Sequence, residues 1–198
     1  MNILEDRHDY ADYPKRAGAS AIAAAPAAAV WAVVAAIGGD NRYYSLNTLW
    51  NIRETLDWLI GGRGLARGRR HPTEIRVGDR IDSWKVIGLE PERRLAMVFG
   101  LRAPGTGVLE FLLEPLPGNR TRLTATAYWH PDGVPGLLYW LAMEPFHQVI
   151  FAGLTREVCR RADRVPGSAA SQCGEIAQAD PASRPVQSPG RTGVGRSQ

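Results

Sequence analysis

One helix-like segment, "LLYWLAMEPFHQVIF" at residues 137–151, carries the strongest candidates for chemistry in this 198-residue sequence. Glu144 and His147 lie three positions apart, a spacing that brings side chains together on one face of a helix. The two groups could form an acid–base couple. They could equally form a mutual hydrogen bond, because a charged residue beside an apolar stripe must be paired or functional. The spacing leaves both roles open.

Aromatic residues accompany this pair. Trp140 and Phe151 belong to the apolar stripe of the same predicted helix, and Trp84 and Tyr128 occur in strand-like segments. Six tryptophans are many for this length, and aromatic side chains around a concave site form an apolar, shape-selective pocket. The alternative is that they are ordinary core residues. Polar selection in such a pocket would come from five residues: Asp82, Arg102, His130, Glu144 and His147.

The stretch "GDRIDSW" contains two carboxylates, Asp79 and Asp82. Three residues apart on a strand means opposite faces, so they would not share a metal ion or a proton. Asp82 would share a face with Trp84, which could be the cavity side. The structural alternative is that Asp79 closes a turn with Gly78 and that Asp82 pairs with an arginine.

Positive charge gathers in residues 61–80, where six arginines stand against two acidic residues. This loop could hold an anion or face a partner, or it could simply be solvated. The candidate contacts are Arg63, Arg67, Arg69 and Arg70. Its glycines follow a predicted helix and lack the G-x-G-x-x-G spacing, which argues against a dinucleotide-binding turn.

Several function classes are not favoured. The sequence pI is about 9.4, but 22 of the 24 basic residues are arginine, a habit typical of GC-rich bacterial genomes rather than of nucleic-acid binding. Neither Cys159 nor Cys173 has metal-ligand spacing, and no hydrolase or metalloprotease motif is present. We therefore predict no metal, no cofactor and no nucleic-acid partner, and we favour a binding protein over an enzyme.

An uncharged run at residues 17–39 raises the question of a membrane span. It is long enough, but twelve of its 23 residues are alanine and Pro26 interrupts it. Four acidic residues precede it, unlike the positive leader of a signal peptide. We predict a strand over 19–24, a helix opened by Pro26, no membrane span and a cytoplasmic location.

The remaining elements define a fold class. A second helix is expected over 45–60, strands over 80–89, 94–102, 107–116 and 120–130, and a long helix over 135–163 that Pro145 bends or interrupts. In the last strand Thr124, Thr126, Tyr128 and His130 alternate with an apolar set, and we expect Tyr128 and His130 to face the cavity. This order predicts an α+β fold of the helix-grip (START-like) type, a curved antiparallel sheet around the C-terminal helix.

Three segments are expected along the chain: a polar lead-in at 1–16, the helix-grip domain at 17–164, and a disordered tail at 165–198. The tail has no aromatic residue and few large apolar ones, so it cannot offset the entropy of ordering.

Five ordered motifs carry a resemblance to a known family: "VWAVVAAIGG", "LWNIRETLDWLIGGRGLARGRR", "VGDRIDSWKV", "RAPGTGVLEF" and "LLYWLAMEPFHQVIF". Across residues 17–162 the chain resembles an uncharacterised domain-of-unknown-function family often found C-terminal to NAD(P)-binding, epimerase-like (atypical short-chain dehydrogenase) domains. The resemblance implies a START/polyketide-cyclase-like (SRPBCC) fold and no particular reaction. Asn41 and Arg42 replace a Gly-Trp of the family, and Gly100 replaces a glutamate, which makes an enzymatic role less expected here.

Three hypotheses follow. The first is a domain that binds a small apolar or amphipathic molecule between sheet and C-terminal helix. The second is a cyclase-, isomerase- or hydrolase-like enzyme that uses Glu144 and His147 in that cavity. The third is an accessory partner of a separate NAD(P)-dependent oxidoreductase.

Overall fold

The computed structural model describes residues 10–39, 68–71, 74–100 and 103–165. Within these ranges the chain forms six strands and two long helices. They are β1 (Lys15–Ala23), α2 (Ala27–Ala35), β2 (Arg80–Ile81), β3 (Trp84–Glu90), β4 (Arg94–Phe99), β5 (Gly105–Leu116), β6 (Arg120–Pro131) and α4 (Gly133–Ala162).

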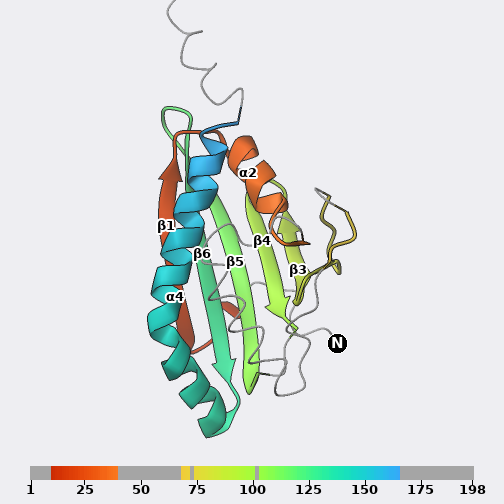
Figure 1. Cartoon of the computed structure of the whole chain (residues 1–198), viewed down its shortest axis with the longest axis vertical. Coiled ribbons are helices and arrows are strands. Elements are labelled where there is room, and N and C mark those ends of the chain that lie inside the picture. Colours follow the sequence, from red (N-terminus) through yellow and green to blue (C-terminus); the bar gives the residue numbers. More distant parts are fainter. Residues whose placement is uncertain (1–9, 40–67, 72–73, 101–102, 166–198) are drawn as a thin grey trace, which may run out of the picture.

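All six strands belong to one antiparallel sheet in the order β1-β6-β5-β4-β3-β2. Helix α4 runs across β1 and β6, and α2 lies over the upper end of the sheet (Figure 1). A long helix held against a curved antiparallel sheet is the helix-grip arrangement, so the predicted α+β fold is confirmed. The predicted helix at 45–60 and nearly all of the predicted tail lie outside the described residues.

Strand β5 shows how the sequence builds a sheet with two buried faces. Leu109, Phe111 and Leu113 alternate with Val108 and Glu110, and all five are buried. Side chains alternate between faces along a strand. The first set packs in the main core with α4 and α2, whereas Val108 packs with Tyr10 and Ile87 on the opposite face. The face away from α4 is therefore also covered.

The main core lies between the concave face of the sheet and the two helices. Helix α4 contributes Ile150, Phe151, Leu154 and Val158 to it. Helix α2 contributes Val30, Val34 and, just beyond its end, Ile37. Burial of these apolar side chains is the main free-energy gain that holds both helices on the sheet.

Three elements differ from the sequence-based expectation. Strand β1 begins at Lys15, before the expected strand at 19 and before the expected domain boundary at 17. The predicted strand at 80–89 is divided into β2 and β3 by a turn at Asp82 and Ser83. The predicted interruption of the last helix at Pro145 is wrong, because α4 continues through this residue. Trp140 before it and Ile150 and Phe151 after it are buried, and this packing outweighs the one hydrogen bond that proline removes.

The uncharged run at 17–39 is not one continuous helix, because β1 and α2 divide it. Among the described residues, no helix combines the length and the apolar character that a membrane crossing requires.

Candidate ligand-binding site

A chain of aromatic contacts extends from β3, next to the edge strand β2, to α4. Trp84 on β3 meets Phe99 on β4 edge to face, with ring centroids 4.9 Å apart. Phe99 meets Trp129 on β6 at 6.5 Å, and Trp129 meets Tyr139 on α4 at 5.3 Å. Each separation lies in the range in which aromatic pairs attract one another. We define the aromatic band as these four residues together with the three that follow on α4: Trp140, His147 and Phe151.

The inner face of α4 completes the band. The ring of His147 lies 4.9 Å from that of Trp140 and 5.7 Å from that of Phe151, stacked on the latter. Positions 140, 147 and 151 recur at seven and four residues, so they follow one stripe of the helix. Trp140 and Phe151 are buried, and His147 is half-buried. An imidazole is thus held between two aromatic side chains.

Two glycines allow Trp129 to connect sheet and helix. Gly107 is its partner on β5, and a Cβ there would lie 3.1 Å from the indole and 3.5 Å from Cβ of Phe99. The missing side chain leaves room for the indole to lie across β5 toward Phe99. The indole Nε1 also donates a hydrogen bond of 3.2 Å to the carbonyl oxygen of Gly136, in the first turn of α4.

Gly136 itself permits a close approach of backbones. A Cβ at this position would overlap the carbonyl oxygen of Pro104 and lie 2.9 Å from Cα of Pro131. The beginning of α4 can therefore sit directly against the end of β6, which places Trp140 beside Trp129 in one buried cluster.

Two predicted site residues lie elsewhere. Tyr128 packs with Tyr10 on the face of the sheet opposite α4, and its hydroxyl donates a hydrogen bond of 3.3 Å to Glu110. His130 is exposed, and its ring meets that of Tyr13. The expectation that they face the cavity is wrong. The α4 side of β6 is lined by the other alternating set: Leu123, Ala125 and Ala127.

The remaining predicted residues divide into two groups. Trp84, Trp140, His147 and Phe151 all belong to the aromatic band, whereas Glu144 is exposed on α4. Arg102, Arg63 and Arg67 lie outside the described residues.

Asp82 organises loops rather than sharing a strand face with Trp84. Its carboxylate accepts backbone hydrogen bonds from Gly39 at 3.2 Å and from Gly68 at 3.1 Å. Its own φ is +52°, in the left-handed region that a short polar side chain tolerates better than alanine does. Asp82 therefore joins the end of the α2 segment, the arginine-rich loop and the β2–β3 turn.

Asp82→Ala is expected to lower the free energy of unfolding by about 2 kcal/mol, because two N–H groups lose their acceptor and the backbone conformation becomes strained. Asp82→Gly removes the same acceptor without the strain, so it should recover roughly 1 kcal/mol of that loss. Guanidinium unfolding of the three proteins measures both differences. Equal stability of the alanine variant and the parent would show that Asp82 does not hold these loops.

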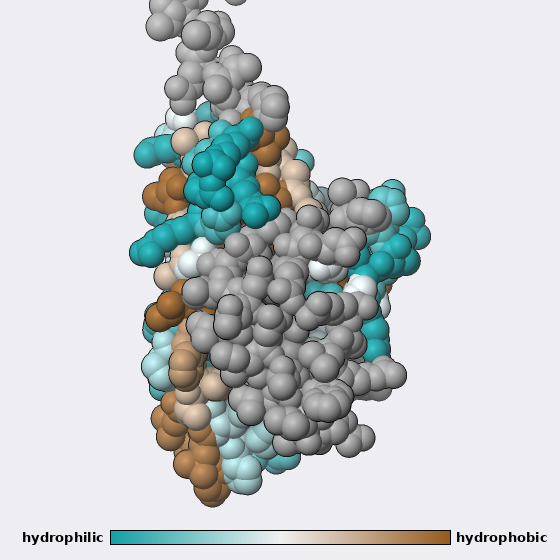
Figure 2. Space-filling model, viewed as in Figure 1, coloured by the Kyte–Doolittle hydropathy of each residue, from teal (hydrophilic) through white to brown (hydrophobic). Residues whose placement is uncertain are grey.

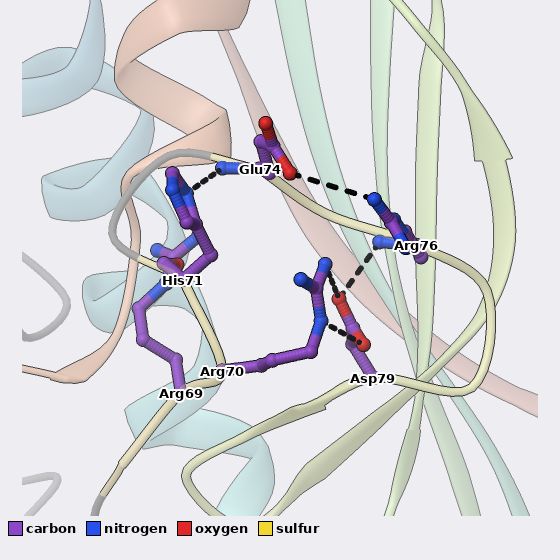
Figure 3. Close-up of polar contacts among 6 residues, drawn as sticks. All are labelled: Arg69, Arg70, His71, Glu74, Arg76 and Asp79. Atoms are coloured by element: carbon purple, nitrogen blue, oxygen red, sulfur yellow. Dashed lines mark hydrogen bonds and ion pairs between the residues drawn. The ribbon is translucent and has the colours of Figure 1, made fainter.

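Arg69 and Arg70, the two arginines of the predicted anion loop that the structure describes, are engaged within the chain (Figure 3). Arg69 donates to the carbonyl oxygens of Ile37, Ala35 and His71 at 2.9, 2.8 and 2.6 Å, so it satisfies carbonyl groups at the end of α2. Arg70 forms a two-pronged ion pair of 2.9 Å with Asp79. Hydrogen bonding to this guanidinium lowers the pKa of Asp79. The expected turn role of Asp79 fits this placement, whereas an anion would have to displace existing partners.

A buried carboxylate on the face away from α4 escaped the sequence analysis. Glu110 is 3% exposed and accepts hydrogen bonds from the hydroxyls of Tyr10 at 2.7 Å and Tyr128 at 3.3 Å. Arg94 lies 3.9 Å from the same carboxylate and also pairs with Glu90 at 2.7 Å. The signal was available in "VLEFLL", residues 108–113, where a single acid interrupts a run of apolar strand residues.

One family model matches residues 7–154, and its description reads "Protein of unknown function (DUF2867)". The chain belongs to the DUF2867 family. No curated protein matches it. The predicted resemblance to a domain of unknown function is thereby confirmed, whereas the position of such domains after an epimerase-like domain stays a prediction.

Solved structures similar to this DUF2867 domain include the Zhui aromatase/cyclase from Streptomyces sp. R1128, at 15% identity and a TM-score of 0.46, covering 76% of this chain and 94% of that one. The solution NMR structure of a protein from Thermobifida fusca has 15% identity and a TM-score of 0.47, and the match covers 76% of this chain and 95% of that one. The di-domain ARO/CYC BexL from the BE-7585A biosynthetic pathway has 17% identity and a TM-score of 0.47, covering 73% of this chain and 46% of that one.

The DUF2867 domain also has an open hollow on its surface, of about 370 Å³, between α2 and the β3–β4 turn. Its walls combine Trp31 and Leu89 with the exposed ion pair of Arg76 and Glu74, at 3.7 Å. An exposed ion pair competes with water, so this hollow offers a ligand little selectivity. It is separate from the aromatic band, with which it shares no residue.

Metal-ligating and thiol groups are two further kinds of candidate within the described part of this DUF2867 domain. No group of three metal-ligating side chains comes together within it. Cys159 is buried in the core, and burial raises the pKa of its thiol to about 11, which keeps it protonated and unreactive at neutral pH.

Proposed function

We propose that this DUF2867 domain binds a small apolar or amphipathic molecule against the aromatic band, between the concave face of the sheet and α4. The observation that carries the proposal is the placement of His147 on the inner face of the helix, where its polar ring stacks on Phe151 and lies tilted against Trp140. Ligand pockets are mostly apolar and aromatic, with a few polar groups that fix orientation. A wall with one imidazole matches that composition.

The geometry of the band favours a flat, unsaturated ligand. Trp84 and Phe99 come from neighbouring strands, and Trp140 and Phe151 come from the facing helix. Aromatic side chains present both faces and edges, which favours rings in offset-stacked or edge-to-face contact. A hydroxyl on such a ring could form a hydrogen bond with the imidazole of His147. We therefore propose a neutral aromatic or polycyclic molecule with a phenol-like group as the ligand class.

A binding role fits the described residues better than acid–base catalysis by Glu144 and His147. Glu144 is exposed, whereas His147 lies among the aromatic rings of the inner face. Both members of an acid–base pair would have to lie within hydrogen-bonding reach of the reacting atoms of a bound substrate. Association with a separate NAD(P)-dependent oxidoreductase stays a prediction, as does the ligand identity.

Three related probes test the role of His147: 2-naphthol, 2-methoxynaphthalene and decalin. We expect saturable quenching of tryptophan fluorescence by both naphthalenes, with 2-naphthol bound most tightly. His147→Phe should weaken 2-naphthol roughly five- to tenfold, the value of one hydrogen bond, and leave 2-methoxynaphthalene nearly unchanged.

His130→Phe is the matched control, because this histidine lies on the opposite face of the sheet beside Tyr13. It should leave all three affinities unchanged. Equal losses in both variants, or a loss of 2-methoxynaphthalene as large as that of 2-naphthol, would contradict a specific polar contact from His147.

A further inference from the structure

The outer face of α4 carries a patch of exposed apolar side chains that do not pack in the core. Six large apolar side chains between residues 134 and 149 are exposed, Val134 at 69%, Leu138 at 60% and Val149 at 57% among them. The others are Leu137, Leu141 and Phe146. Figure 2 shows hydrophobic residues along the free side of α4 in the lower part of the view. We define these six residues as the α4 patch.

The centre of the patch is one stripe along the helix. Val134, Leu138, Leu141 and Val149 follow it together with Pro145, at spacings of four, three, four and four, and at 100° per residue they stay within one side of the helix. Leu137 and Phe146 flank this stripe, one on each side. Trp140, His147 and Phe151 lie on the opposite side, toward the sheet. The stripe is about 22 Å long at 1.5 Å per residue. A continuous exposed apolar stripe of this kind marks an interaction surface.

The order of residues along the stripe is symmetric about the point between Leu141 and Ala142. Equal steps from that point reach four pairs of positions: Leu141 and Ala142, Leu138 and Pro145, Leu137 and Phe146, and Val134 and Val149. A two-fold axis through the midpoint would place each member of a pair opposite the other in a second copy. Contacts of this self-complementary kind are what a two-fold dimer requires.

The scarcity of charged residues along the outer face of α4 is compatible with the pairing of two α4 helices. Between positions 133 and 155 the sequence has one glutamate, Glu144, and no aspartate, lysine or arginine. In the symmetric antiparallel register it faces position 139 of the second copy, and the two glutamates are offset by about 7.5 Å along the helix axis. The patch lacks the lysines and arginines that bind helices to anionic lipid surfaces. Beyond it the outer face becomes charged, with Arg156, Glu157 and Arg160.

We propose that two copies of this chain pair through the α4 patch, with the helices antiparallel about a two-fold axis at residues 141 and 142. In this dimer the outer face of α4 is covered by the second copy. Its inner face still contributes Tyr139, Trp140, His147 and Phe151 to the aromatic band. Each contact of a two-fold interface occurs twice, so single substitutions act on both halves of the dimer.

Sedimentation equilibrium of the full chain, over roughly a hundredfold range of protein concentration, tests the pairing because dimer populations follow mass action. We expect a reversible dimer. Val134→Lys combined with Val149→Lys places like charges opposite each other and should raise the dissociation constant about a hundredfold. Val134→Lys combined with Val149→Glu places opposite charges there and should keep the dissociation constant within about tenfold of the parent.

Val77→Lys is the matched control, because Val77 is 57% exposed in a turn away from α4, and it should dimerise like the parent. Unchanged far-UV circular dichroism would show that all variants are folded. A parent that stays monomeric, or equal dimerisation of the two double variants, would overturn the proposal. A monomer that sediments with phosphatidylcholine vesicles would assign the patch to a lipid surface instead.

Discussion

Glu110→Ala is expected to lower the free energy of unfolding by about 3 kcal/mol, because it leaves buried polar groups without their acceptor. The hydroxyls of Tyr10 and Tyr128 both donate to this carboxylate, and Arg94 lies 3.9 Å from it. Tyr10 is 1% exposed, so water cannot replace the lost acceptor without opening this face of the sheet. Equilibrium unfolding in guanidinium measures the loss.

Glu110→Gln is the matched comparison. The amide keeps the shape and one acceptor oxygen, so we expect less than half of the loss caused by alanine. Arg94 keeps its hydrogen bond to Glu90 in both variants. A loss in the glutamine variant as large as that in alanine would mean that the negative charge, rather than hydrogen bonding, holds the cluster.

The same cluster predicts an alkaline response. Burial, with the hydrogen bond to Glu110, raises the pKa of Tyr10 well above its usual value near 10. Above pH ~10 the unfolded chain loses this proton and the folded chain keeps it, so stability falls by about 1.4 kcal/mol per pH unit until the folded pKa is reached. Tyr10→Phe should remove the contribution of Tyr10 to this fall of the free energy of unfolding with pH. Identical slopes between pH ~10 and 11 would contradict it.

Gly136→Ala should also cost about 3 kcal/mol, because its Cβ would overlap the backbone carbonyl of Pro104 and approach Cα of Pro131. Neither neighbour is the movable end of a side chain. The first turn of α4 must therefore shift, which strains the hydrogen bond from Trp129 to Gly136 and moves Trp140. Thermal or guanidinium unfolding, with tryptophan fluorescence as the probe, reports both effects.

Gln148→Ala is the control for this substitution, because it places alanine in the same helix at an exposed position that does not belong to the α4 patch. It should change the stability of the monomer by less than about 0.5 kcal/mol. A Gly136→Ala protein as stable as the parent would show that the close approach of α4 to the end of β6 is not required.

Local sequence patterns predicted the order of the elements well. The β4, β5 and β6 segments are separated by turns rich in glycine and proline, and these turns delimit strands regardless of long-range packing. Pro26 opens α2 as expected, since proline is tolerated at the beginning of a helix. The interruption expected at Pro145 is wrong, because the cost of one lost hydrogen bond is a local quantity, whereas the packing of α4 on β1 and β6 depends on residues distant in sequence.

The candidate site was only partly predictable. Helical spacing correctly grouped Trp140, His147 and Phe151. The alternation in β6 showed two faces without showing which one meets α4, and Tyr128 was placed on the wrong face. Small residues such as Ala125 allow a helix to approach a sheet closely, whereas Tyr128 is covered by Tyr10 from a segment expected to be a polar lead-in. Contacts between residues so distant in sequence leave no local pattern.

Native mass spectrometry of the purified full chain, compared with the same sample after denaturation, tests the binding role most directly. We expect a discrete added mass in the native spectrum that is lost on denaturation. The released molecule should have the ultraviolet spectrum of an aromatic compound. A protein that is free of ligand as purified, and that also binds neither naphthalene probe with saturation, would contradict the proposal that the aromatic band is a binding site.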